Sequence, residues 1–135
     1  MNSTTISRLA AAITLTAGLG VAAAVPAQAS HGDKGREVQN SGQCSMGASW
    51  KLKAKADDGQ LEVEAEVDTN QAGQTFNWQF VDNGNVAAQG SSTTAGASGS
   101  FSVERRIANL AGKDKIVFTA NNPDNGETCK GKVRF

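Results

Sequence analysis

Few side chains of this chain could do redox or nucleophilic chemistry, and the two cysteines are the most informative of them. The 135-residue sequence contains Cys44, Cys129 and a single histidine, His31. An even pair of cysteines in an exported chain is most simply a disulfide. Two free thiols or a metal-binding pair are the alternatives, but a metal site would have no further Cys and only one His as ligands. Because the closed loop would span most of the domain, the chain-entropy model predicts a stabilisation of about 4–5 kcal/mol.

The other reactive groups do not form a catalytic pattern. His31 lies in a polar segment outside the predicted fold, so a Ser-His-Asp triad or a Cys–His pair has no imidazole to use. Three carboxylates, Glu62, Glu64 and Glu66, alternate along one segment, but each is expected to face a lysine on a solvated surface. No glycine-rich phosphate loop leads into a helix. We therefore predict that the protein is not an enzyme and has no cofactor and no metal site.

The elements that would position these residues begin after a predicted export signal, residues 1–29. One cation, Arg8, precedes an apolar run that continues to Val25, and Ala27-Gln28-Ala29 supplies small residues at the −3 and −1 positions of a cleavage site. No Arg-Arg pair precedes the run, which favours Sec-type export. A membrane anchor would need ~18 or more apolar residues and a stop signal. We expect cleavage after Ala29 and a secreted chain with no membrane insertion.

The new N-terminus would be Ser30-His31, where a free amine and an imidazole could chelate Cu(II). The preferred amino-terminal copper motif has histidine third, however, and a lone exposed histidine is usually only solvated. Residues 30–43 are polar and lack apolar periodicity, so they are predicted to form a flexible N-terminal arm.

Residues 44–135 are predicted to form one β-sandwich domain. Cleavage removes one cation from a chain with a net charge of +0, so the mature chain has a net charge of about −1. No clustered positive excess of the kind that nucleic-acid binding requires is present.

The clearest local pattern is a hairpin between residues 50–56 and 60–68. Apolar and charged side chains alternate in both segments, and Asp58-Gly59 between them is a type I′ turn signal. With that turn, each lysine of the first strand faces a carboxylate of the second, in the pairs Lys51–Glu66, Lys53–Glu64 and Lys55–Glu62. Each pair is worth ~0.2–1 kcal/mol, and the matching sets the register.

Five further short strands follow, and no segment has the pattern of a long amphipathic helix. The expected strands are residues 74–81, 86–89, 100–107, 115–120 and 127–135. About seven strands at roughly ten-residue intervals are typical of an immunoglobulin-like β-sandwich. Such sandwiches usually run the first strand beside the last, in parallel, so Cys44 and Cys129 are expected to bridge these two strands.

The whole mature chain resembles small secreted actinobacterial proteins of uncharacterised function. The motifs that carry the resemblance are Cys44, Trp50-Lys51-Leu52-Lys53-Ala54-Lys55, Asp58-Gly59, Ser98-Gly99-Ser100-Phe101, Asn122-Pro123 and Gly126-Glu127-Thr128-Cys129. The resemblance implies secretion and an immunoglobulin-like sandwich. It implies no activity and no binding residue.

The aromatic residues are expected to build the core. The chain has two Trp, five Phe and no Tyr, and all seven fall on the inward parity of the predicted strands. Core packing is the usual role of such residues. No aromatic side chain is then left to stack on sugars or bases, although polar loops could still bind sugars.

Two rows of cations are predicted on outward faces. Lys51, Lys53 and Lys55 form one row, and Lys130, Lys132 and Arg134 form the other. Together they could make a basic strip for an anionic wall polymer. Because the glutamates neutralise the first row, and because the two rows are offset along the strands, a solvated row that protects a sheet edge is the favoured interpretation.

These observations favour a non-catalytic domain, expected to be a monomer, that recognises an unknown extracellular protein or cell-envelope component through its loops. One alternative is an inhibitor of a secreted hydrolase that inserts the loop of residues 90–99. Another is a structural matrix protein that associates through an edge strand.

Overall fold

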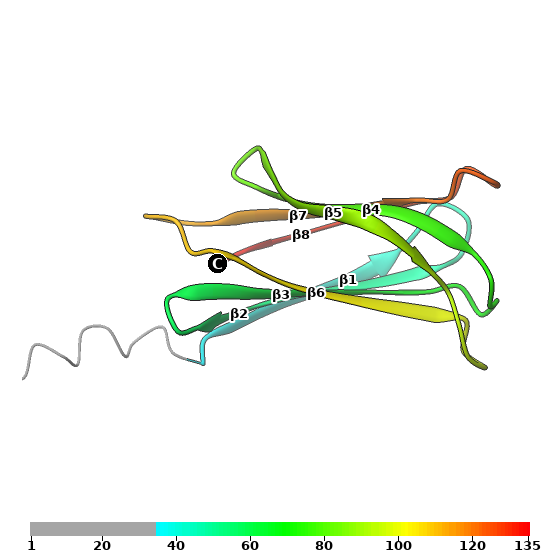
Figure 1. The fold of residues 1–135 in the computed structure, drawn as a ribbon, viewed down its shortest axis with the longest axis horizontal. Helices are drawn as coiled ribbons and strands as arrows, with labels where there is room; N and C mark the ends of the chain where they lie inside the picture. The colour runs from blue at the N-terminus through cyan, green and yellow to red at the C-terminus, as the bar shows by residue number, and fades with distance from the viewer. Residues whose placement is uncertain (1–34) are drawn as a thin grey trace, which may run out of the picture.

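The computed structural model describes residues 35–135 and shows an all-β, immunoglobulin-like sandwich of two antiparallel sheets (Figure 1). The predicted signal peptide, its cleavage site after Ala29 and the Ser30-His31 pair lie outside the described residues. Within residues 35–135, no helix is long and apolar enough to cross a membrane.

Each sheet has four strands. Sheet A has the order β1-β2-β3-β6, and sheet B has the order β5-β4-β7-β8. The strands are β1 (Glu37–Gln43), β2 (Ser49–Asp57), β3 (Gln60–Asp68), β4 (Thr75–Asp82), β5 (Asn85–Thr93), β6 (Ser100–Ala108), β7 (Lys115–Asn121) and β8 (Thr128–Arg134). In Figure 1 the sheets form two layers, with the C-terminus at the end that holds the β2–β3 hairpin.

The predicted hairpin is confirmed residue by residue. Lys51, Lys53 and Lys55 pair with Glu66, Glu64 and Glu62, as the sequence pattern requires. The turn residues Asp58 and Gly59 have φ angles of 48° and 79°. Positive φ at both central residues defines the type I′ turn, whose twist matches that of the strands.

The prediction of a flexible arm was wrong for residues 37–43, which form β1 and pair with β2. The inward positions of this strand are Val38, Asn40 and Gly42, so the apolar alternation of a half-buried strand is missing. Gly42 has a structural reason, because a Cβ there would lie 2.8 Å from Cζ2 of Trp50. The sequence pattern therefore did not predict this strand, because one of its inward positions is a glycine that makes room for the Trp50 side chain.

The predicted loop of residues 90–99 is also shorter than expected. Its first four residues belong to β5, which pairs with β4 as far as Thr93. At the inward position Gly90 a Cβ would lie 2.7 Å from Cζ2 of Trp78, and at Ser92 the Oγ atom accepts a 3.0 Å hydrogen bond from Trp78 Nε1. The inward positions of this edge strand are small or polar because Trp78 packs against them, so the strand lacks the apolar alternation that would have predicted it.

All seven aromatic side chains are buried in the core, as predicted. Phe80 lies between Trp78 and Phe118, with ring centroids 5.6 Å away in both directions. Phe76 and Phe101 connect the two sheets at 5.7 Å. Offset and tilted aromatic pairs of this kind stabilise a core beyond the area that they bury.

The disulfide between Cys44 and Cys129 is present, and it joins the end of the first strand to the last strand. The expected parallel pairing of the first and last strands is not seen, because they belong to different sheets. Instead, the edges of β1 and β8 face each other across the side of the sandwich, where Asn40 Nδ2 donates a 3.1 Å hydrogen bond to the Lys132 carbonyl. We call this region the seam.

Trp50 fills the space behind the seam. A Cβ at Gly131 of β8 would overlap the indole ring, as one at Gly42 of β1 would. Two glycines on facing edges thus leave the volume that the largest side chain occupies. The disulfide and the indole together hold the two sheets at this side.

Candidate binding surfaces

The loops at the disulfide end of the sandwich are tied down by buried polar groups. Thr94 Oγ1 donates a 2.6 Å hydrogen bond to the Gln71 carbonyl and accepts one of 2.9 Å from the Gln74 amide. Gly99, with a φ of 64°, packs against the Gln71 backbone so closely that no Cβ would fit. The turn at residues 94–99 is therefore held against the β3–β4 loop rather than projecting from the domain.

Glu127 holds a second pair of loops together. Its side chain is buried, and Oε2 accepts hydrogen bonds from the amides of Met46 and Ala48 at 3.0 and 3.1 Å. These contacts fasten the β1–β2 loop to the β7–β8 loop beside the disulfide. A carboxylate that accepts two backbone N–H groups is a strong structural contact, which makes this end of the molecule rigid.

The outer face of sheet A carries charges of both signs that largely neutralise one another. Lys53 Nζ lies 3.6 Å from Glu64 Oε2, and Arg106 is paired with Asp57. One like-charge neighbour is present, because Glu104 lies opposite Glu64 in the register of β3 and β6.

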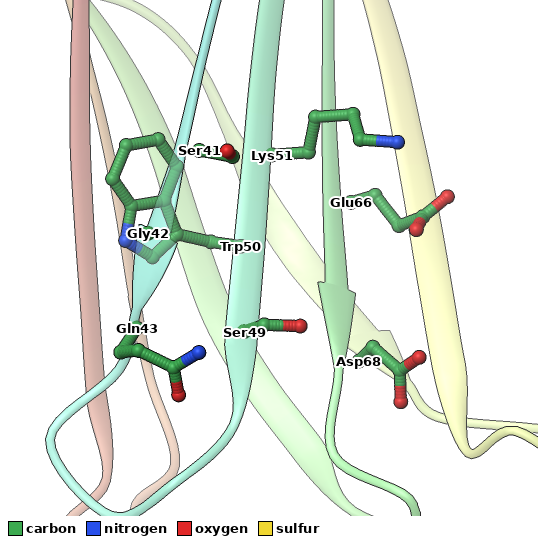
Figure 2. Close-up of a pocket in the computed structure, with 8 residues that line it drawn as sticks. All are labelled: Ser41, Gly42, Gln43, Ser49, Trp50, Lys51, Glu66 and Asp68. Carbon is green, nitrogen blue, oxygen red and sulfur yellow. The ribbon is translucent and has the colours of Figure 1, made fainter.

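A shallow hollow of about 330 Å³ on this face is bordered by one of the predicted glutamates, Glu66. Figure 2 shows Lys51 and Glu66 next to each other on the outer surface, while the indole of Trp50 projects toward β1 where Gly42 crosses it. Glu62, Glu64 and Glu66 face lysines, as predicted, but these residues are half-buried rather than fully solvated. Apart from Gly42 and Trp50, the side chains that line the hollow are polar or charged.

The outer face of sheet B has a different chemical character. A hollow of about 440 Å³ is bordered by amide and hydroxyl side chains of three neighbouring strands: Asn77, Gln79, Gln89, Thr119 and Asn121. None of these side chains takes part in the hydrogen bonds among residues 35–135, whereas the neighbouring Thr75 and Thr93 hydroxyls bond to each other at 2.8 Å. We call these five residues the amide face.

A row of cations borders the amide face. Lys130, Lys132 and Arg134 are exposed on the outward side of β8, and Lys115 lies opposite Arg134 in the register of β7 and β8. We call these four residues the cation row. Of the residues that the structure describes, no carboxylate lies within ion-pairing distance of the row, since the ion pairs found there are Lys53–Glu64 and Arg106–Asp57.

Asp82 and Asp114 form a buried acidic pair at the hairpin end of the sandwich. Asp114 Oδ1 accepts a 3.2 Å hydrogen bond from the Leu110 amide. Asp82 Oδ1 and Asp114 Oδ2 are buried without a partner among the described N–H and O–H groups. Burial, the charge of Asp114 and a hydrogen bond between the two carboxyls raise the pKa of Asp82 from 3.8 to about 6.

Sequence reasoning located the disulfide and the charged hairpin but missed the amide face and the acidic pair. Between Thr75 and Thr93 the sequence contains one charged residue, Asp82, and this uncharged run was an available signal for the amide face. The acidic pair left no signal, because Asp82 and Asp114 are far apart in the chain and meet only when β4 and β7 pair.

Comparison of the chain with protein-family models, with curated proteins and with solved structures finds no match.

Proposed function

We propose that this protein is a secreted, non-catalytic binding module that recognises a cell-envelope component or an extracellular protein through the outer face of sheet B. The observation that carries this proposal is the difference between the two sheet faces. On sheet A each lysine of β2 lies opposite a glutamate of β3, and two ion pairs, Lys53–Glu64 and Arg106–Asp57, form there. On sheet B the side chains of the amide face and the cation row have no hydrogen-bond or ion-pair partners among the described residues. Polar groups that have no partner within the protein and are arranged on a sheet are suited to holding a ligand.

Secretion is supported by the sequence pattern of residues 1–29 and by the disulfide, which is compatible with an oxidising compartment. Expression of the full chain with analysis of the culture medium tests this part. Intact-mass measurement should find a chain that begins at Ser30 and contains one disulfide. Retention of the uncleaved chain in the cell fraction would contradict it.

A binding role is tested by co-sedimentation of the secreted protein with isolated cell envelope, and by affinity capture from culture supernatant. The variant Asn77→Ala/Gln79→Ala/Asn121→Ala removes amides from sheet B without touching the core. The matched control, Gln39→Ala/Ser41→Ala/Gln43→Ala, removes polar side chains from the outer face of sheet A. Saturable retention that only the first variant abolishes is the expected result. Retention of nothing, or equal loss in both variants, would overturn the proposal.

A further inference from the structure

We infer that the cation row and the amide face together bind an anionic polysaccharide that lies across β8, β7 and β4. This inference deepens the proposed function by naming the ligand class. The cations would contact acidic groups of the polymer, and the amides would hydrogen bond to its hydroxyl groups.

The cation row is a repeated and unpaired array. Alternate residues of one strand lie on the same face about 6.8 Å apart, so Lys130, Lys132 and Arg134 present positive charge at regular intervals. Lys115 adds a fourth charge opposite Arg134. A linear polymer with repeated acidic groups is the ligand that complements a linear array of cations.

The rival interpretation of these lysines is protection of an open sheet edge. The structure weakens it, because the free edge of β8 is already partly covered. The Thr128 carbonyl accepts a 2.9 Å hydrogen bond from the Ser45 amide, and the Lys132 carbonyl accepts one from Asn40. The disulfide holds the same edge against the β1 side of the seam. An edge closed in this way has less need of charges that repel other strands.

The lysines on the outer face of sheet A differ from the cation row, because a carboxylate lies opposite each of them. Lys51, Lys53 and Lys55 each face a glutamate of β3. On sheet B, the strand beside the cation row presents Thr119 opposite Lys130, and Gln79 of β4 follows opposite Thr119. The carboxylates nearest to the row in these strands, Asp82 and the Asp114 that precedes Lys115, are both buried. The neighbourhood of the cation row therefore offers hydroxyl and amide groups rather than carboxylates, which suits a sugar with an acidic substituent.

The test measures binding of the secreted protein to polygalacturonate, a polysaccharide that carries carboxylates, and to a phosphomannan, a polysaccharide that carries phosphates. Neutral dextran and a DNA duplex serve as comparison ligands. The variant Lys130→Gln/Lys132→Gln/Arg134→Gln removes the row on β8. The matched control, Lys51→Gln/Lys53→Gln/Lys55→Gln, removes the same number of charges from sheet A. Near-ultraviolet circular dichroism confirms that both variants are folded.

The inference predicts binding to one or both acidic polymers that weakens with added salt. The β8 variant should lose roughly tenfold or more in affinity, and the sheet A variant should lose little. An equal loss in both variants, or equal affinity for DNA, would show non-specific attraction and overturn the inference.

The inference and the proposed function can fail separately. If neither acidic polymer binds while envelope retention persists and depends on Asn77, Gln79 and Asn121, the ligand class is wrong and the binding face is right. If envelope retention is also absent, both are wrong.

Discussion

Asp82 and Asp114 hold their carboxyl groups against each other in a buried position at the hairpin end of the sandwich, with 5% and 0% of their surface exposed. Two ionised carboxylates in such a place would repel each other, and two of their oxygens, Asp82 Oδ1 and Asp114 Oδ2, would lack hydrogen-bond donors. A proton on Asp82 removes one charge and lets one carboxyl donate to the other. The burial of Asp82 beside Asp114 therefore favours the protonated form of Asp82.

The acidic pair predicts that the protein loses stability as the pH rises. The folded-state pKa of Asp82, about 6, lies above the ordinary value of 3.8. Its contribution is therefore fully present below about pH 4 and is lost as the pH rises through 6. By linkage, the free energy of unfolding should fall by on the order of 2 kcal/mol between pH 4 and pH 7. Urea unfolding at several pH values measures it.

The control for this prediction is Asp82→Asn, whose amide can donate to Asp114 at every pH. This variant should be more stable than the wild type at pH 7, and the contribution of Asp82 to the pH dependence should disappear. Asp124→Asn, a change at an exposed loop carboxyl, should leave the dependence as it is. A wild-type profile that Asp82→Asn does not alter would contradict the assignment.

The packing of Trp50 against Gly131 predicts that a single methyl group disrupts the seam. In Gly131→Ala the new Cβ would overlap the indole ring, and overpacking of this kind costs about 1–3 kcal/mol. Urea unfolding of Gly131→Ala, Trp50→Leu and the double variant forms a thermodynamic cycle. The alanine should cost much less in the Trp50→Leu background, because the smaller side chain frees the space. Equal costs in both backgrounds would show that the glycine serves another purpose.

The contacts of Glu127 predict a selective effect on stability. Glu127→Ala leaves the buried amide of Ala48 without its acceptor, and the expected loss is about 2–3 kcal/mol in the free energy of unfolding. Glu127→Gln keeps an amide oxygen in the same position and should lose clearly less. Chemical denaturation of both variants makes the comparison. Similar losses below ~0.5 kcal/mol for both would mean that the two hydrogen bonds contribute little.

The disulfide is predicted to supply a large part of the stability. Cys44 and Cys129 are separated by 85 residues, and releasing a loop of this length restores unfolded-chain entropy worth about 4–5 kcal/mol. Cys44→Ala/Cys129→Ala should therefore unfold at much lower guanidinium concentration. Dithiothreitol should destabilise the wild type to a similar degree and leave the double variant unchanged. A loss below ~1 kcal/mol would exclude the loop-entropy account.

Most of the fold could be predicted from local patterns in the sequence. In β2 and β3 the two-residue alternation, the Asp58-Gly59 turn and the opposite charges specify the same register, and the structure shows that register. The same alternation placed every aromatic ring in the core. Agreement between several local signals leaves a strand little freedom to pair differently.

The two edge strands show where such patterns fail. Gly42 in β1 and Gly90 in β5 stand at inward positions because tryptophans from the neighbouring strands fill the space above them. The sequence around a glycine does not show that a tryptophan ring packs against it in the folded protein. The sequence therefore suggested an arm and a loop where the protein forms strands.

The sequence by itself determined the secondary structure class, the central hairpin, the buried aromatic set and the cysteine pair, because each depends on residues that are near in the chain or on the scarcity of alternatives. Only the tertiary structure decided which faces carry unmatched groups. Whether Lys130 or Asn77 has a partner, and whether Asp82 meets another carboxyl, depends on strands brought together from distant parts of the chain. Long-range pairing sets these contacts. The nearly uncharged run around Asn77 is the one local sign of the amide face, and it does not show which side chains lie beside it.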